Sequence, residues 1–409
     1  MTSELRRSLG LFDAVVIGLG SMVGAGIFVA LGPAAEAAGS GAGLLWALGA
    51  AAVVAYCNAM SSASLAARHP ASGGTYVYGR ERLGSFWGHL AGWAFVAGKT
   101  ASCAAMALTV GAYLWPERAH AVAVAAVVAL TALNYRGLQK SALLTRAIVA
   151  LVLAVLACVV TVSFQAGGKG PAALGGDLTT DGVLQAAGLL FFAFAGYARI
   201  ATLGEEVRDP ARTIPRAVPL ALGLALAVYG LVAVSVLTVL GPTALAASPA
   251  PLADAARAAD AAWLVPLVTA GAAVAALGSL LSLILGVSRT TLAMARDAYL
   301  PTALAAVHPR FRVPHRAELA VGAVVAVMAA TVDVRGAIGF SSFGVLVYYG
   351  IANASAWTLG GRHRPLAALG LVGCAALAFA LPTGAVLAGT GVLATGVVAW
   401  SVTRGRTTR

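Results

Sequence analysis

The spacing of glycines in the first apolar run is the feature of the sequence that most suggests chemistry. Gly18, Gly20, Gly24 and Gly26 place four glycines within nine residues. Each glycine weakens a helix interior by about 1 kcal/mol relative to alanine, so this run unwinds easily. A helix N-terminus exposed by unwinding attracts a carboxylate, and freed carbonyls attract an ammonium group. Such a break can therefore bind an α-amino acid through backbone alone.

A second apolar run, 188–197, carries a comparable interruption, with glycines at Gly188 and Gly196. Paired interruptions of this kind are typical of secondary transporters, which bind substrate near the middle of the bilayer. Two other interpretations of the glycines stay open. A dinucleotide fingerprint would need a preceding strand and a soluble βαβ unit. A glycine face for helix packing would need only Gly20 and Gly24, but would leave the second interruption unexplained.

Two cations, Lys99 and Arg199, lie inside apolar runs. A charge at the bilayer centre costs at least about 2.5–3.5 kcal/mol, so such residues are candidates for function. The nearest acidic residues, Asp13, Glu205 and Glu206, fall toward the ends of runs. Substrates with a second positive charge are therefore disfavoured, and neutral or anionic amino acid side chains are favoured.

These cations suggest two further hypotheses. Burial disfavours the charged form of a lysine, so Lys99 could release a proton in one conformation and bind it in another. Alternatively, Lys99 stays charged and structural. Arg199 could pair with Glu205 or Glu206 and form an ion-pair gate, or the acidic pair could belong to an ordinary solvated loop.

The composition indicates which elements hold these residues. Of 409 residues, 60% are apolar and only 10% charged, with a mean hydropathy of +0.88. A soluble protein needs about 25% charged residues. Since a span needs about 20 apolar residues, we predict twelve transmembrane helices, near 11–31, 42–66, 87–114, 119–134, 142–165, 183–203, 216–241, 262–294, 317–332, 336–359, 365–381 and 384–402.

Basic residues are distributed unevenly between the loops on the two sides of these spans. With the N-terminus in the cytoplasm, 21 of the 27 lysines and arginines lie inside, four outside, and Lys99 and Arg199 within spans. Such asymmetry sets orientation. We therefore expect a multi-pass protein of the cytoplasmic membrane with both termini cytoplasmic. The net charge of +12 is then an orientation signal, and we expect no nucleic-acid partner.

Residue patterns for other chemistries are weak. The four cysteines, Cys57, Cys103, Cys158 and Cys374, lack paired spacing. The six histidines lie at loops or span ends without metal-ligand spacing. We expect no enzyme, no cofactor and no metal site. An ion channel, which needs a ring of carbonyls or charges around its pore, is a further alternative.

The sequence resembles the amino acid–polyamine–organocation superfamily of transporters. The first-helix motif of that family is similar to 24–28, its sixth helix and following loop to 191–197 and 205–216, and the exit of its eighth helix to 288–301. The resemblance implies an all-α fold of the LeuT type, with helices 1 and 6 broken. Its parts would be a first inverted repeat at 1–165, a second at 182–360, and two helices with a basic tail at 361–409.

The resemblance also implies roles for residues of the site. The N–H groups of Ala25 and Gly26 would bind the substrate carboxylate. The carbonyls of Met22, Phe192 and Ala195 would accept from its ammonium group. Phe192 would also form an aromatic gate over the site, and Lys99 would face the substrate. Further residues of the predicted site are Gly20, Ser21, Gly24, Phe194 and Gly196.

Two positions depart from the family pattern. Ala198 stands where many members have an acidic residue, and Val152 stands where many proton-linked members have a lysine. Lys99 could replace that lysine, so H⁺ is the expected coupling ion. A sodium site would instead use Ser279 and Ser282 with helix-one carbonyls, although such hydroxyls more often bond their own backbone.

Together these observations predict a secondary active transporter of amino acids that works by alternating access, as a proton-coupled carrier or an exchanger. We expect it to function as a monomer in the lipid bilayer. The alternatives are an exchanger of polyamines or cationic amino acids, and an ion channel.

Overall fold

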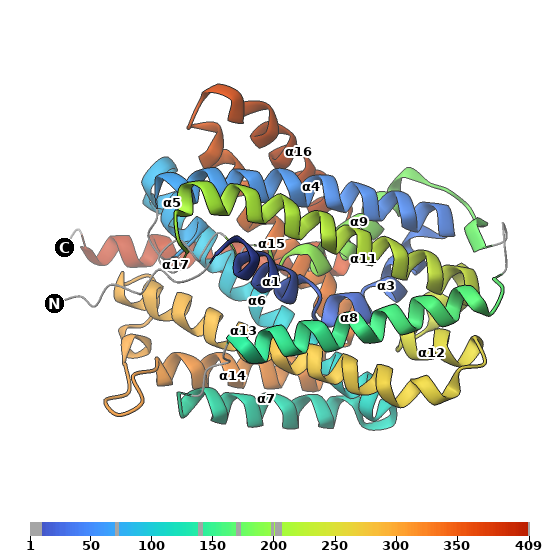
Figure 1. Cartoon of the computed structure of the whole chain (residues 1–409). Coiled ribbons are helices and arrows are strands. Elements are labelled where there is room, and N and C mark those ends of the chain that lie inside the picture. The colour runs from blue at the N-terminus through green and yellow to red at the C-terminus, as the bar shows by residue number, and fades with distance from the viewer. Residues whose placement is uncertain are drawn as a thin grey trace.

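Helices form almost the whole described structure. The computed structural model describes residues 10–69, 73–137, 142–168, 173–197, 200 and 207–407. Within these ranges the regular structure is helical, apart from isolated bridge residues, among them Ser40 and Gly176, which pair antiparallel. The long helices lie roughly side by side along one axis (Figure 1). The structure is thus an α-helical bundle, as predicted.

Nine helices are long and apolar enough to cross a membrane within the described ranges. They match nine of the twelve predicted spans. The remaining three, predicted at 183–203, 317–332 and 365–381, correspond to the shorter helices α9 (Thr180–Phe194), α14 (His315–Thr331) and α16 (Arg364–Ala380). A multi-pass helical membrane protein is therefore confirmed, whereas the count of twelve spans and the inverted repeats remain predictions.

Apart from the first span, which is described below, the helices long enough to cross a membrane follow the predicted apolar runs closely. In chain order they are α4 (Gly41–Arg68), α6 (Ser85–Leu114), α7 (Ala119–Tyr135), α8 (Ala142–Gln165), α11 (Pro210–Ala247), α13 (Val265–Arg296), α15 (Val334–Trp357) and α17 (Thr383–Thr407). Shorter elements connect them: α5 (Thr75–Leu83), α12 (Pro251–Ala258), and the 3-10 turns η1 (Pro116–Arg118), η3 (Ala262–Leu264), η4 (Thr302–Ala305) and η5 (Gly361–His363).

The first span is divided into three helices. These are α1 (Leu11–Met22), α2 (Ala25–Val29) and α3 (Leu31–Ala38). The α1 and α2 helices are separated by Val23 and Gly24, which leave the helical conformation. The glycine cluster therefore predicts correctly that this span is broken.

The centre of the bundle is formed by α6 and α15. In their most apolar windows 78% and 83% of the residues are buried, against 22% for α7 and α17 at the periphery. A Cβ atom on Gly344 would lie 2.9 Å from the Cα of Gly98, so the backbones of α15 and α6 touch at this pair. Small residues that allow such an approach are typical of helix contacts within membranes. This contact holds α6, and Lys99 with it, at the centre.

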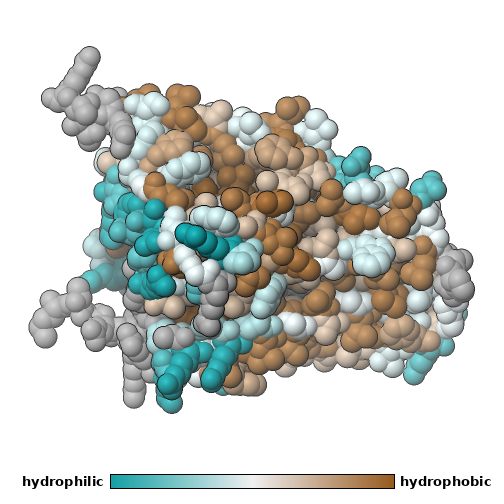
Figure 2. Space-filling view, turned by 90° about the horizontal axis from the view of Figure 1, so that it is seen from above, coloured by the Kyte–Doolittle hydropathy of each residue, from teal (hydrophilic) through white to brown (hydrophobic). Residues whose placement is uncertain are grey.

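The surface is divided into an apolar belt and polar ends. Figure 2 shows hydrophobic residues across the middle of the molecule and hydrophilic residues gathered mainly at one end. Large apolar side chains stand outward from the long helices, with Val128 of α7 58% and Leu231 of α11 54% exposed. A soluble protein rarely exposes so continuous an apolar surface, so the belt is the part of the surface that contacts lipid.

Candidate functional site

The break in the first span exposes backbone groups at the centre of the bundle. Val23 ends α1 with its N–H bonded to the carbonyl of Leu19, 2.7 Å away. Gly24 precedes α2, and its N–H bonds back to the carbonyl of Met22 at 2.7 Å. As at any helix start, the first N–H groups of α2, from Ala25 onward, have no partner within the helix. Ala25 and Gly26 are both buried.

The second interruption begins within the predicted segment 188–197. The α9 helix ends at Phe194, and Ala195 leaves the helical conformation with ψ near 2°. Turn-like bonds follow, from the N–H of Tyr197 to the carbonyl of Phe194 at 3.3 Å. The continuation of the sixth span through Ala198 and Arg199 lies outside the described residues. The near side of this break is thus observed, and the far side is a prediction.

Two glycines bring the interruptions into direct contact. A Cβ atom on Gly196 would lie 2.1 Å from the carbonyl oxygen of Ser21 and 2.8 Å from the nitrogen of Met22. A Cβ atom on Gly26 would lie 2.7 Å from the Cα of Ala193. Hydrogen is therefore the only side chain that fits at either position, and the two broken segments meet backbone to backbone.

Tyr229 of α11 joins the same two segments and was not singled out by the sequence. Its hydroxyl is within bonding distance of the carbonyls of Met22 (2.6 Å) and Ala193 (3.0 Å). The side chain is 1% exposed, and its ring stacks edge-on against Phe194 at 5.1 Å between centroids. One phenolic proton is thus shared between two freed carbonyls. The only sequence signal that could have indicated this role is a tyrosine hydroxyl within an apolar run.

Lys99 reaches the backbone at the end of α9, and its part in substrate binding stays a prediction. Its Nζ donates to the carbonyl of Ala195 at 3.3 Å, and the side chain is 8% exposed. The hydroxyl of Tyr349 on α15 approaches the same oxygen at 3.5 Å. Among the described residues the ion pairs do not include Lys99. The buried amine is held by a backbone carbonyl.

The other predicted residues are placed as follows. Ser21 donates to Ile17 of its own helix at 2.9 Å, and Gly20 faces Val149 of α8. Phe192 is buried, 7% exposed, so its part as a gate is still a prediction. The predicted gate residues Arg199, Glu205 and Glu206 lie outside the described residues.

The two serines proposed for sodium differ in their surroundings. A Cβ atom on Gly24 would lie 2.4 Å from the Oγ of Ser279, so this hydroxyl sits directly against the break. Ser282 instead donates to Gly278 of its own helix at 3.1 Å, which is the ordinary behaviour of such hydroxyls. Only Ser279 is next to the freed backbone.

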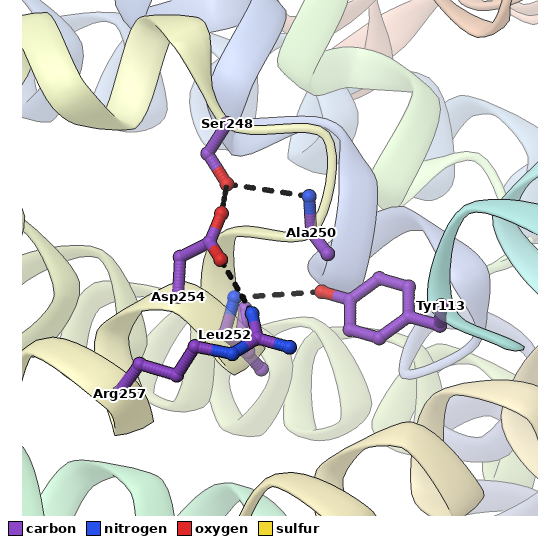
Figure 3. Close-up of polar contacts among 6 residues, drawn as sticks. All are labelled: Tyr113, Ser248, Ala250, Leu252, Asp254 and Arg257. Carbon is purple, nitrogen blue, oxygen red and sulfur yellow. Dashed lines mark hydrogen bonds and ion pairs between the residues drawn. The ribbon is translucent and has the colours of Figure 1, made fainter. Parts of the chain in front are cut away.

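Polar contacts link the helices at the end of the bundle that holds α12. The hydroxyl of Tyr113, at the end of α6, donates to the carbonyl of Phe28 on α2 at 2.8 Å and accepts from the N–H of Leu252 on α12 at 3.4 Å. Figure 3 shows Tyr113 directed at Leu252, with Asp254 of the same helix joined to Ser248 and Arg257. The loop helix α12 is thus tied to the broken first span.

Two further polar contacts link helices, one at this end of the bundle and one at the opposite end. Arg335 of α15 pairs with Glu36 of α3 and donates to the carbonyl of Ala246 at 2.6 Å. At the end that holds α5, Asp297 accepts from the hydroxyl of Tyr76 and from Arg80, the latter at 2.9 Å. Burial, followed by the hydrogen bond to Asp297, raises the pKa of Tyr76.

Comparison with known proteins gives a consistent result. The model of a family described as amino acid permease matches residues 9–403. An uncharacterized transporter of Mycobacterium tuberculosis is 72% identical over 407 residues, covering 98% of this chain and 92% of the relative. Human cationic amino acid transporter 4 is 29% identical over 382 residues, 85% of this chain and 59% of the relative. The branched-chain amino acid permease BcaP of Bacillus subtilis is 26% identical over 364 residues, 80% and 76% of the two chains.

Proposed function

Because this chain belongs to the amino acid permease family of the amino acid–polyamine–organocation transporters, we propose that it is a secondary active carrier whose substrate is an amino acid with a neutral or anionic side chain. It works by alternating access in the cytoplasmic membrane, as a monomer with both termini in the cytoplasm. It needs no cofactor and carries out no covalent chemistry.

The observation that supports this proposal is the meeting of two interrupted helices at Gly26 and Gly196. Non-helical backbone at membrane depth is tolerated where it is buried in protein or lines a cavity. The first N–H groups of α2, with the positive end of the helix dipole, suit a carboxylate. The carbonyls of Met22 and Ala195 lie on the other side of the break and suit an ammonium group.

Lys99 supports the choice of side chain. It is a buried cation beside the carbonyl of Ala195, so an arginine, lysine or polyamine substrate would meet like charge in a low-dielectric site. Cationic amino acid transporters are among the relatives at 26–29% identity, and so is a branched-chain permease. The name of such a distant relative does not decide between these classes, whereas the charge at Lys99 acts directly on the substrate.

A direct test uses the full chain purified and reconstituted in liposomes. A thermal-shift screen of the twenty amino acids and putrescine identifies binders, since a specific ligand stabilises the folded state by mass action. Counterflow of labelled amino acids then measures transport, and saturation separates a carrier from a channel. Neutral or acidic amino acids should compete for uptake. Strong competition by arginine or putrescine would instead establish the cationic alternative.

Proton coupling is assigned to Lys99 as part of the same proposal. Its amine donates to the freed carbonyl of Ala195 at the second break, and a proton bound there would be lost or gained as its surroundings change. Uptake should then accelerate under an inward proton gradient, and Lys99→Gln should abolish that acceleration. Retention of pH-driven uptake in this variant would remove Lys99 from the coupling step. Dependence on Na⁺ would favour the Ser279 alternative.

A further inference from the structure

The two interruptions leave backbone groups whose burial without hydrogen-bond partners is unfavourable. Each unwound segment frees carbonyl oxygens that are buried away from water. A buried acceptor without a donor is strongly unfavourable. An amino acid ammonium can supply donors, but only while it is bound. The return of the carrier without substrate therefore depends on what else can donate to these carbonyls.

Tyr229 supplies one such donor from the chain itself. Its hydroxyl reaches the Met22 carbonyl at 2.6 Å and the Ala193 carbonyl at 3.0 Å, one from each interrupted helix. The phenol lies in α11, outside both interruptions, and is 1% exposed. The Met22 oxygen also accepts from the N–H of Gly24 at 2.7 Å, so both of its lone pairs are used.

Lys99 supplies a second donor on the other side of the break. Its Nζ donates to the Ala195 carbonyl at 3.3 Å, the last freed oxygen of α9 before Gly196. Like Tyr229, Lys99 comes from a helix that is continuous at this depth, α6. Its ammonium has the same chemistry as that of an amino acid. The amine is covalently attached, so it is present whether or not a substrate is.

From this geometry we infer that Lys99 and Tyr229 are built-in donors that replace the substrate ammonium at the freed carbonyls. The empty carrier can then change conformation, and transport proceeds as net uptake as well as exchange. This inference rests on the proposed function and goes beyond it, because it assigns the mode of transport. Both residues are positioning residues for the substrate-free step, and an incoming ammonium displaces them from the shared carbonyls.

The test compares two rates in liposomes that contain the purified full chain. Net uptake of a ¹⁴C-labelled mixture of the twenty amino acids is measured into vesicles without internal amino acid. Exchange is measured into vesicles preloaded with the unlabelled mixture. Both rates are taken at equal pH on the two sides of the membrane, so that a loss of proton coupling at Lys99 does not change their ratio. The wild type should give net uptake at a rate similar to that of exchange. Tyr229→Phe removes the side-chain donor of the Ala193 carbonyl, and Lys99→Met leaves the Ala195 carbonyl with only the Tyr349 hydroxyl at 3.5 Å. Each variant should therefore lower the ratio of net uptake to exchange by about tenfold.

Matched controls come from the same two helices. Ser235 of α11 and Thr109 of α6 are buried hydroxyls that donate to their own helices, to Val232 at 2.9 Å and Ala105 at 2.8 Å. Ser235→Ala and Thr109→Val should leave the ratio unchanged. Lys99→Arg, which keeps a charged donor, should restore part of the net uptake lost in Lys99→Met.

Each outcome decides a different question. If the wild type shows neither rate, the proposed function fails. If it exchanges but gives no net uptake, the function stands and the inference is overturned. The inference is also overturned if the variants keep the wild-type ratio, or if both rates fall equally, because a purely structural role lowers both together. Should Tyr229→Phe not fold, Lys99→Met decides by the same criterion.

Discussion

Replacing Gly196 with alanine tests whether contact between the two broken segments is required for transport. The added Cβ would lie 2.1 Å from the Ser21 carbonyl oxygen, 2.4 Å from the Ser21 carbonyl carbon and 2.8 Å from the Met22 nitrogen. All three are backbone atoms, which cannot rotate away as a flexible side chain does. The first contact is roughly 1.5 Å closer than ordinary van der Waals packing allows, so the segments must separate.

The magnitude follows from the cost of overpacking. Extra methyl groups in a packed interior cost typically about 1–3 kcal/mol, and each 1.4 kcal/mol is about a factor of ten in an equilibrium constant. Separation of the segments also pulls the Met22 carbonyl from Tyr229. We therefore expect Gly196→Ala to lower exchange in liposomes by at least about tenfold, and to lower the melting temperature of the purified protein.

Gly230 provides the matched control for this experiment. It lies in α11 next to Tyr229, and nothing stands within 4 Å of a Cβ atom built there. Alanine is more favourable than glycine in a helix interior by about 1 kcal/mol, so Gly230→Ala should fold and transport at least as well as the wild type. If Gly196→Ala transports as fast as Gly230→Ala, the backbone contact has no part in the cycle.

Three further predictions address the ends of the bundle and the serine at the break. Tyr113→Phe removes the hydroxyl that links α2 to α12, and should leave expression intact while raising the accessibility of nearby engineered cysteines to thiol reagents. Unchanged labelling would show that this hydroxyl does not hold α12 against α2. In the wild type a raised pKa keeps the Tyr76 hydroxyl protonated, and so able to donate to Asp297, at both pH 6 and pH 8. Tyr76→Phe should therefore change the transport rate by the same factor at the two pH values, and a factor that differs between them would contradict this reasoning. If Na⁺ stimulates uptake at all, Ser279→Ala should abolish the stimulation and Ser282→Ala should not, and equal loss in both would show that position relative to Gly24 is irrelevant.

Features that follow from a local sequence pattern could be predicted from the sequence. The break at Gly24 follows from glycines within an otherwise apolar run, and the interruption after Phe194 from the glycine that follows. Apolar length likewise predicts nine of the spans as helices that could cross a membrane. The predicted runs 317–332 and 365–381 also coincide with helices, α14 and α16, but these helices have 17 residues each and are not among the nine.

Features that depend on distant contacts could not be predicted in this way. The sequence has ten tyrosines, and no local pattern distinguishes Tyr229 from the rest. Its role arises because α11 passes the point where two other helices break, which is a property of three-dimensional packing. Tyr349 is missed for the same reason. Lys99 was found from sequence because a buried charge is conspicuous in an apolar run, although its carbonyl partner was not.

These contacts also explain why glycine and a polar anchor occur together at this site. Gly26 and Gly196 let two backbones touch, and that contact leaves carbonyls which no helix can satisfy. A site built only from glycines would therefore be stable only while filled. Donors from α6 and α11 remove that restriction, because continuous helices carry them to fixed positions. If the ratio of net uptake to exchange is unaffected by Lys99→Met and Tyr229→Phe, the remaining donors are sufficient, namely the Tyr349 hydroxyl at the Ala195 carbonyl and the Gly24 N–H at the Met22 carbonyl. Tyr349→Phe would then be the next variant to measure.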